Sequence, residues 1–162
     1  MEIFSGDYED LSEADRWFLM ARAYLDCSIR LFSEIKASTL ARSFYHVQAA
    51  HCLFEHSVEL FLKAGVAQAS KRVPTSHNIG ELYNRFRYLY PGKAYEFQGK
   101  ILNLACLDPN RPYNEFNRYP ADHTGQLWRR NSHYSLDIWL EQLQFFDKDF
   151  QRLEPLLKAR YP

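Results

Sequence analysis

Apolar side chains recur at steps of three and four residues along most of this chain, the spacing that brings them to one face of an α-helix. The sequence lacks the strict polar–apolar alternation that is typical of a β-strand, and it contains no internal repeat. These observations predict an all-α helical bundle. The clearest helical series is Trp17, Ala21, Tyr24, Ser28, Leu31 and Ile35.

Prolines and glycines divide this helical pattern into segments. Pro74 should end the second helix, because the residue before a proline is disfavoured in helical geometry. Pro91 and Gly92 should end the third helix, and Pro155 should bend or restart the last one. We therefore expect helices at about 14–35, 43–69 (the central one), 75–90 and 93–107, an irregular connection over about 108–127, and a final helix from about 132 onward.

Length and composition set broad limits on what the chain does. The 162 residues fit one domain, 1–162, with a core from about 12 to 157. Aromatic residues make up 16% of the chain, which favours large interlocking side chains. Lys plus Arg and Asp plus Glu number 20 each, so any contact with nucleic acid must be local.

The cysteines and the N-terminal segment indicate the cellular compartment. Cys27, Cys52 and Cys106 are odd in number and far apart, which predicts reduced thiols. Acidic residues dominate the segment before Arg16, unlike the basic start of a signal peptide. No apolar stretch is long enough to cross a bilayer. We expect a cytoplasmic protein without membrane contact.

Three segments of the chain resemble the HEPN superfamily, small helical bundles found with nucleotidyltransferases and in toxin–antitoxin systems. Thr75–Leu82, TSHNIGEL, is similar to the family's T-x-H-x-L-x-x-L opening of a short middle helix. Asn117–Asp122, NRYPAD, resembles its A-R-Y-P-D loop, with Ala121 inserted, and 14–31 resembles its A-x-x-W-L-x-x-A-x-x-x-L first helix. The resemblance covers most of 11–157 and implies an up-and-down bundle of four to five helices, often dimeric.

The resemblance also implies a pair of residues that would be catalytic. Many catalytic HEPN proteins are metal-independent ribonucleases in which an Arg and a His, separated by four to six residues, meet across a dimer interface. Arg118 and His123 have that separation. In such a site His123 would move a proton at the ribose hydroxyl, while Arg118 would stabilise charge developing on the phosphate.

Other pairs limit the weight of this motif. Arg72 and His77 show the same separation, so chance alone accounts for such pairs. Pro120 lies within the candidate motif, which normally occupies the start of the last helix. A competing pair, His133 with Arg129 or Arg130, lies closer to that helix but is spaced too tightly; solvated arginines are the simpler interpretation.

Arginines and aromatic residues alternate between Arg111 and Arg130, where the local charge is positive. Guanidinium groups bind phosphates and aromatic faces stack on bases, so this segment is the best candidate contact for a nucleotide or single-stranded RNA. The alternative is structural, with the loop folding back on the bundle. The candidate ligand-binding residues are Arg118, Tyr119, Asp122, Trp128, Arg129 and Arg130.

The histidines of the second helix do not predict a metal site. His46, His51 and His56 advance by five residues each and so point in three directions. His51, Glu55 and Glu59 share one face, where a polar stripe at the surface or between helices is the favoured interpretation. His77 is expected to bond to backbone groups near the start of the third helix. We predict no metal and no cofactor.

Three functional hypotheses follow, and whether the chain is an enzyme stays open among them. The preferred one is a non-catalytic nucleotide- or RNA-associated binding module of HEPN type, acting as a homodimer. The second is a toxin-like, metal-independent endoribonuclease that uses Arg118 and His123. The third is a structural partner of a nucleotidyltransferase.

Overall fold

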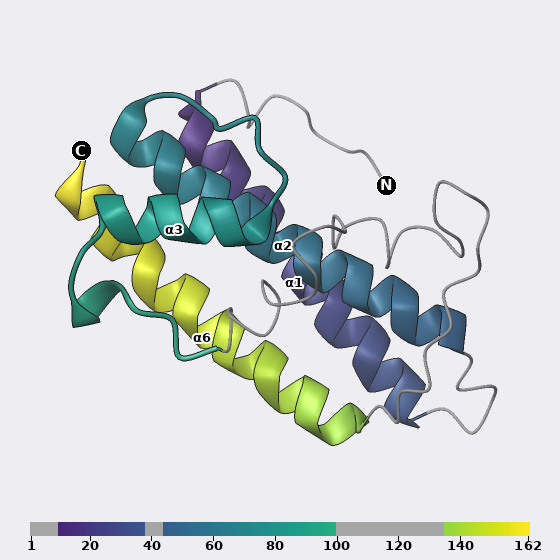
Figure 1. Cartoon of the computed structure of the whole chain (residues 1–162). Helices are drawn as coiled ribbons and strands as arrows, with labels where there is room; N and C mark the ends of the chain where they lie inside the picture. The colour runs from purple at the N-terminus through teal and green to yellow at the C-terminus, as the bar shows by residue number, and fades with distance from the viewer. Residues whose placement is uncertain (1–9, 38–43, 100–134) are drawn as a thin grey trace.

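The computed structural model describes residues 10–37, 44–99 and 135–162, and they form a helical bundle (Figure 1). This confirms the predicted all-α fold, and no strand occurs in the described ranges. None of the helices found there is both long enough and apolar enough to span a membrane. The helical elements are α1 (Glu13–Ala37), α2 (Phe44–Ser70), α3 (Ile79–Leu89), the short 3-10 helix η2 (Lys93–Tyr95) and α6 (Leu136–Arg160).

Helices α1, α2 and α6 lie along one another, while α3 crosses one end of the bundle (Figure 1). Helix α2 runs antiparallel to α1 and parallel to α6, so two of the three long helices share one direction. Every residue from 57 to 67 of α2 is buried, because α1, α3 and α6 all pack against it. Helix α2 is therefore the central helix, as its apolar surface predicted.

Stacked and edge-on aromatic rings fill the core. Phe61 of α2 stacks on Phe150 of α6, with ring centroids 4.0 Å apart, and meets Phe18 of α1 edge-on at 5.1 Å. Phe54 of α2 meets Phe146 of α6 edge-on, with ring centroids 4.9 Å apart. Such ring pairs add about 0.5–1.5 kcal/mol each to the burial of their area. The high aromatic content thus serves, in this part of the chain, to join three helices.

Helix ends agree with the sequence signals in most places. Asn78 caps α3, its side-chain oxygen accepting the N–H of Glu81 at 3.1 Å, and Ser135 caps α6. Tyr90 ends α3 directly before Pro91, as expected. Pro155 was expected to bend or restart the last helix, yet α6 continues through it without a restart.

The prediction of a helix over 93–107 is wrong for its first part. Only Lys93–Tyr95 is helical, as a single 3-10 turn, and 96–99 are not; the remainder lies outside the described residues. Asp149 of α6, fully buried, accepts the backbone N–H groups of Gln98 and Gly99 at 2.7 and 2.8 Å.

Arg152 of α6 also holds this segment in place. It donates to the carbonyl oxygens of Ala94 and Glu96, both at 2.6 Å, and to the Asp149 carboxylate at 2.8 Å. Backbone groups that would have closed helical turns are therefore bonded to side chains of α6 instead. The expected irregular connection over 108–127 lies outside the described residues.

Candidate functional site

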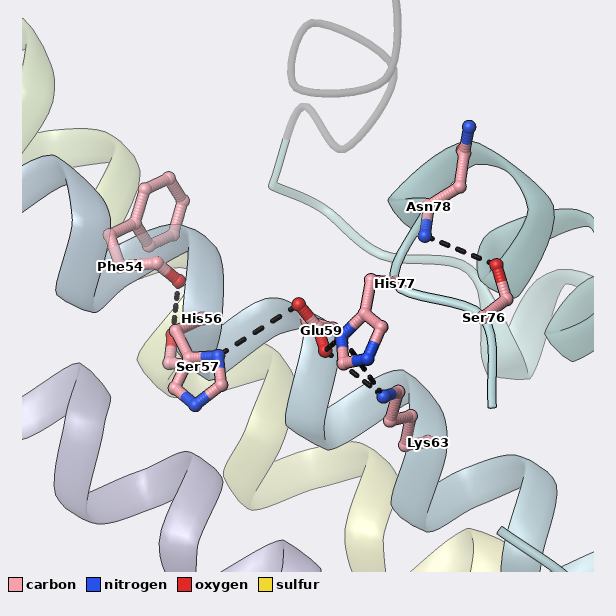
Figure 2. A network of polar contacts seen from close by, with 8 residues as sticks. All are labelled: Phe54, His56, Ser57, Glu59, Lys63, Ser76, His77 and Asn78. Atoms are coloured by element: carbon pink, nitrogen blue, oxygen red, sulfur yellow. Dashed lines mark hydrogen bonds and ion pairs between the residues drawn. The ribbon is translucent and has the colours of Figure 1, made fainter. Parts of the chain in front are cut away.

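The site residues that the sequence predicted all lie outside the described ranges. This holds for the catalytic pair Arg118 and His123, for the competing His133, and for the candidate ligand-binding residues Tyr119, Asp122, Trp128, Arg129 and Arg130. Their roles stay predictions. Within the described residues, a group of ionisable side chains surrounds the buried Glu59 in the middle of α2 (Figure 2).

Glu59 is buried, with a side chain that is only 1% exposed, and bases from two parts of the chain surround its carboxylate (Figure 2). Lys63, one turn further along α2, places Nζ 3.1 Å from Oε1. His77, in the connection before α3, places Nδ1 2.8 Å from the same oxygen. His56, one turn back along α2, places Nδ1 3.8 Å from Oε2. We call these four residues the Glu59 cluster.

These bases keep the buried carboxylate ionised. Burial alone would raise the pKa of Glu59, but the neighbouring His56, Lys63 and His77 outweigh it and lower the pKa from 4.5 to about 2. Lys63 is itself buried, 4% exposed, so its ammonium group depends on Glu59 for a counter-charge. Glu59 and Lys63 are therefore buried as a pair, because each compensates the charge of the other.

The geometry also fixes which nitrogen of His77 carries the proton. An ionised carboxylate only accepts hydrogen bonds, so Nδ1 of His77 must donate to Glu59. Lys63 Nζ lies 3.4 Å from His77 Nδ1. Both nitrogens are then hydrogen-bond donors, and both are directed at the Glu59 carboxylate. A neutral His77 ring carries its lone pair on Nε2. The His77 side chain is 66% exposed, whereas the Glu59 side chain is 1% exposed.

Aromatic rings of α1 cover the rest of the Glu59 cluster. The ammonium group of Lys63 lies 5.7 Å from the ring centroid of Trp17, a cation–π contact. Tyr24 meets the His56 ring edge-on at 4.6 Å. Three parts of the chain, α1, α2 and the connection before α3, thus converge on one buried carboxylate.

The segment Thr75–Leu82, on which part of the HEPN resemblance rests, supplies one member of this cluster. Its His77 reaches Glu59, its Asn78 caps α3, and its Ile79 and Leu82 are buried against the core. Ser76 donates to Glu81 at 2.7 Å and steadies the same turn. The sequence predicted that the His77 ring bonds to nearby backbone, and it missed Glu59, 18 residues away.

The polar stripe of α2 runs between helices rather than at the surface. His51, Glu55 and Glu59 are all buried. The His51 ring lies edge-on to Trp139 at 4.0 Å and to Phe32 at 5.2 Å, while His46 is exposed. Over the described residues, no three His, Cys, Asp or Glu side chains are grouped so that they would hold a metal ion.

Comparisons with known proteins give no family for this chain. No protein-family model, no curated protein and no solved structure matches it. The resemblance to HEPN bundles therefore stays a prediction that rests on the motifs in the sequence.

Proposed function

We propose that this chain is a non-catalytic nucleotide- or RNA-associated binding module of HEPN type. The observation that carries the proposal is the bond between His77 and Glu59. Through it, the histidine of the family-like Thr75–Leu82 segment ties a short, transverse third helix to the central helix. A motif histidine that has a defined structural partner supports the resemblance better than the sequence match alone does.

The binding residues of this module belong to the segment Arg111–Arg130. It contains Arg118, Arg129 and Arg130 for phosphate groups and Tyr119 and Trp128 for stacking on bases. The whole chain has no net charge, so affinity must come from such a local concentration of arginine. We expect micromolar-range, strongly salt-dependent binding rather than a broad electrostatic attraction.

Fluorescence anisotropy with labelled oligouridine tests this proposal. The parent protein should bind, and the triple variant Arg118→Gln/Arg129→Gln/Arg130→Gln should bind weakly and with a smaller dependence on salt. The matched control is Arg16→Gln/Arg22→Gln/Arg30→Gln, three arginines of α1, which should leave affinity nearly unchanged. No binding by the parent at low salt would remove the proposal.

The endoribonuclease is a second candidate, favoured by the spacing of Arg118 and His123 alone. Incubation of the purified protein with RNA in the presence of a chelator should then give cleavage that Arg118→Ala and His123→Ala both abolish. RNA left intact by the parent, or cut equally by all three proteins, would exclude this activity.

We further propose a cytoplasmic homodimer, with a nucleotidyltransferase as the partner class that the resemblance implies. A dimeric mass by light scattering supports the first part, and a monomer at high concentration contradicts it. Co-purification of a nucleotidyltransferase from the native host, with no thermal shift on adding nucleotide, would instead favour the purely structural role.

A further inference from the structure

A hollow of about 360 Å³ lies at the C-terminal end of α3, and no residue of the Glu59 cluster lines it. It is lined by the end of α3, the turn at Pro91–Gly92 and the 3-10 helix η2, and it opens to solvent. This volume lies at the lower end of the range for ligand pockets, enough for one nucleoside. The side chains that the argument uses are Asn84, Arg87, Tyr88, Tyr90, Tyr95 and Glu96.

Three tyrosines supply the walls of the hollow. Tyr90 is buried, and its hydroxyl donates to the carbonyl oxygen of Gly65 at 2.9 Å, so its ring is fixed. Tyr95 is half-buried, with the Arg160 guanidinium 5.5 Å from its ring centroid. Tyr88 is 84% exposed, the most exposed large apolar side chain in the described part of the chain. An aromatic ring with so little contact to the core is available to stack on a planar partner.

The chain segment that contributes the hollow is rich in basic residues, although one arginine and one glutamate balance each other in the lining itself. The segment 71–99 has five cationic side chains against two acidic ones, and all seven are exposed. Arg87 and Glu96 belong to the lining itself, and Asn84 adds an amide. The cationic residues are Lys71, Arg72, Arg85, Arg87 and Lys93, and the acidic ones are Glu81 and Glu96.

We infer that this hollow binds a nucleotide, either as one unpaired residue of an RNA strand or as a free nucleotide. The base stacks on Tyr88, the carboxylate of Glu96 and the amide of Asn84 face its polar edge, and Arg87 meets a phosphate. The exposed ring of Tyr88 beside Arg87 favours this ligand over an acidic peptide, which has no base to stack. The inference rests on the proposed nucleotide- or RNA-associated function but places a binding site on different residues.

Anisotropy titration of labelled oligouridine, with variants of the hollow, tests this inference. Tyr88→Ala should weaken binding about tenfold, because loss of one base–aromatic stack has an effect of that size. Tyr88→Phe keeps the ring and should restore affinity to within about twofold. Since Tyr88 is almost fully exposed, neither change should affect folding, and circular dichroism checks that directly.

Two further experiments test the role of the charged residues and whether the bound nucleotide is free or part of a strand. Arg87→Gln should reduce the salt dependence of binding, whereas Arg30→Gln on α1 should not. Displacement of the oligouridine by uridine monophosphate at comparable concentration identifies a free-nucleotide site, and much weaker displacement identifies a strand site. Displacement by polyglutamate as effective as by RNA would overturn the inference.

The result also distinguishes this inference from the proposed function. If Tyr88→Ala and Arg87→Gln bind like the parent while Arg118→Gln/Arg129→Gln/Arg130→Gln does not, the hollow is excluded and the proposed function stands. If the reverse holds, the hollow is the binding site and the Arg111–Arg130 segment is not. A parent that binds no oligouridine and no nucleotide overturns both.

Discussion

Nδ1 of His77 lies 2.8 Å from Oε1 of Glu59, which joins an exposed ring in the connection before α3 to a carboxylate buried in the central helix. The same oxygen receives the buried ammonium group of Lys63 at 3.1 Å. This arrangement fixes the position of α3 relative to α2 through charge as well as through packing. The Thr75–Leu82 segment, and the hollow at the other end of α3, depend on that position.

Removal of the charge on Glu59 should destabilise the bundle. In Glu59→Gln the buried Lys63 ammonium loses its counter-charge, which should lower the free energy of unfolding by about 3 kcal/mol. His77→Ala should lower it by only about 1 kcal/mol, because the histidine side chain is largely exposed. Urea unfolding followed by circular dichroism measures both.

A control variant and a double variant make this comparison specific. Glu34→Gln, an exposed glutamate of α1, should change stability by less than about 0.5 kcal/mol. Glu59→Gln/Lys63→Met removes both buried ions and should be more stable than Glu59→Gln alone. If the double variant loses as much free energy of unfolding as Glu59→Gln and Lys63→Met lose together, the two charges do not interact.

Acid should remove the contribution of Glu59 in a defined range of pH. Its pKa is lowered by folding, from 4.5 to about 2, so the folded state holds this carboxylate ionised more strongly than the unfolded state does. The stabilisation is complete above pH 4.5 and is lost as the pH falls towards about 2. A shift of this size is worth about 3 kcal/mol.

The free energy of unfolding, measured against pH, checks this assignment. The parent should lose stability faster than Glu59→Gln between pH 4.5 and about 2, and the two curves should converge at the acidic end. Parallel curves across this range would mean that Glu59 titrates alike in both states.

Asp149 should control the backbone of Gln98 and Gly99. In Asp149→Asn the amide cannot accept both N–H groups and also pair with Arg152, so stability should fall by about 3 kcal/mol. Hydrogen exchange read at single amides should show faster exchange at Gln98 and Gly99. Glu141→Gln, at an exposed position of α6, serves as the control, and unchanged exchange in Asp149→Asn would contradict the anchor.

Gly65 should tolerate no larger residue. A Cβ there would lie 2.7 Å from Cε2 of Phe86, a fully buried ring. Gly65→Ala should therefore lower stability by about 1–3 kcal/mol, despite the higher helix propensity of alanine. Adding Phe86→Leu makes room for the methyl group, so a double-mutant cycle should give a favourable coupling energy. Purely additive effects would contradict this contact.

The long helices could be predicted from the sequence because their signals are local. The spacing of apolar residues in α1 and α2 placed their ends within two residues of the structure, and Asn78 and Ser135 cap helices in the usual way. The central position of α2 followed from its wide apolar face. These features need no knowledge of which segments meet.

Features that depend on distant partners could not be predicted in this way. The carboxylate of Asp149 binds backbone some 50 residues away, and this contact replaced the expected helix after Lys93. Glu59 stood in a recognised polar stripe, yet only the fold shows that His77 is its partner. The spacings from Glu59 to Lys63 and to His56, each about one helical turn, were the local signals of the cluster.

Photocrosslinking of a 4-thiouridine oligonucleotide to the purified protein, with the adducts located by mass spectrometry, tests the central claim of nucleotide or RNA association most directly. The account predicts adducts on the Arg111–Arg130 segment, on the hollow around Tyr88 and Tyr95, or on both, with competition by unlabelled RNA. Adducts spread over α1 and α6 without competition, or no adducts at all, would contradict it.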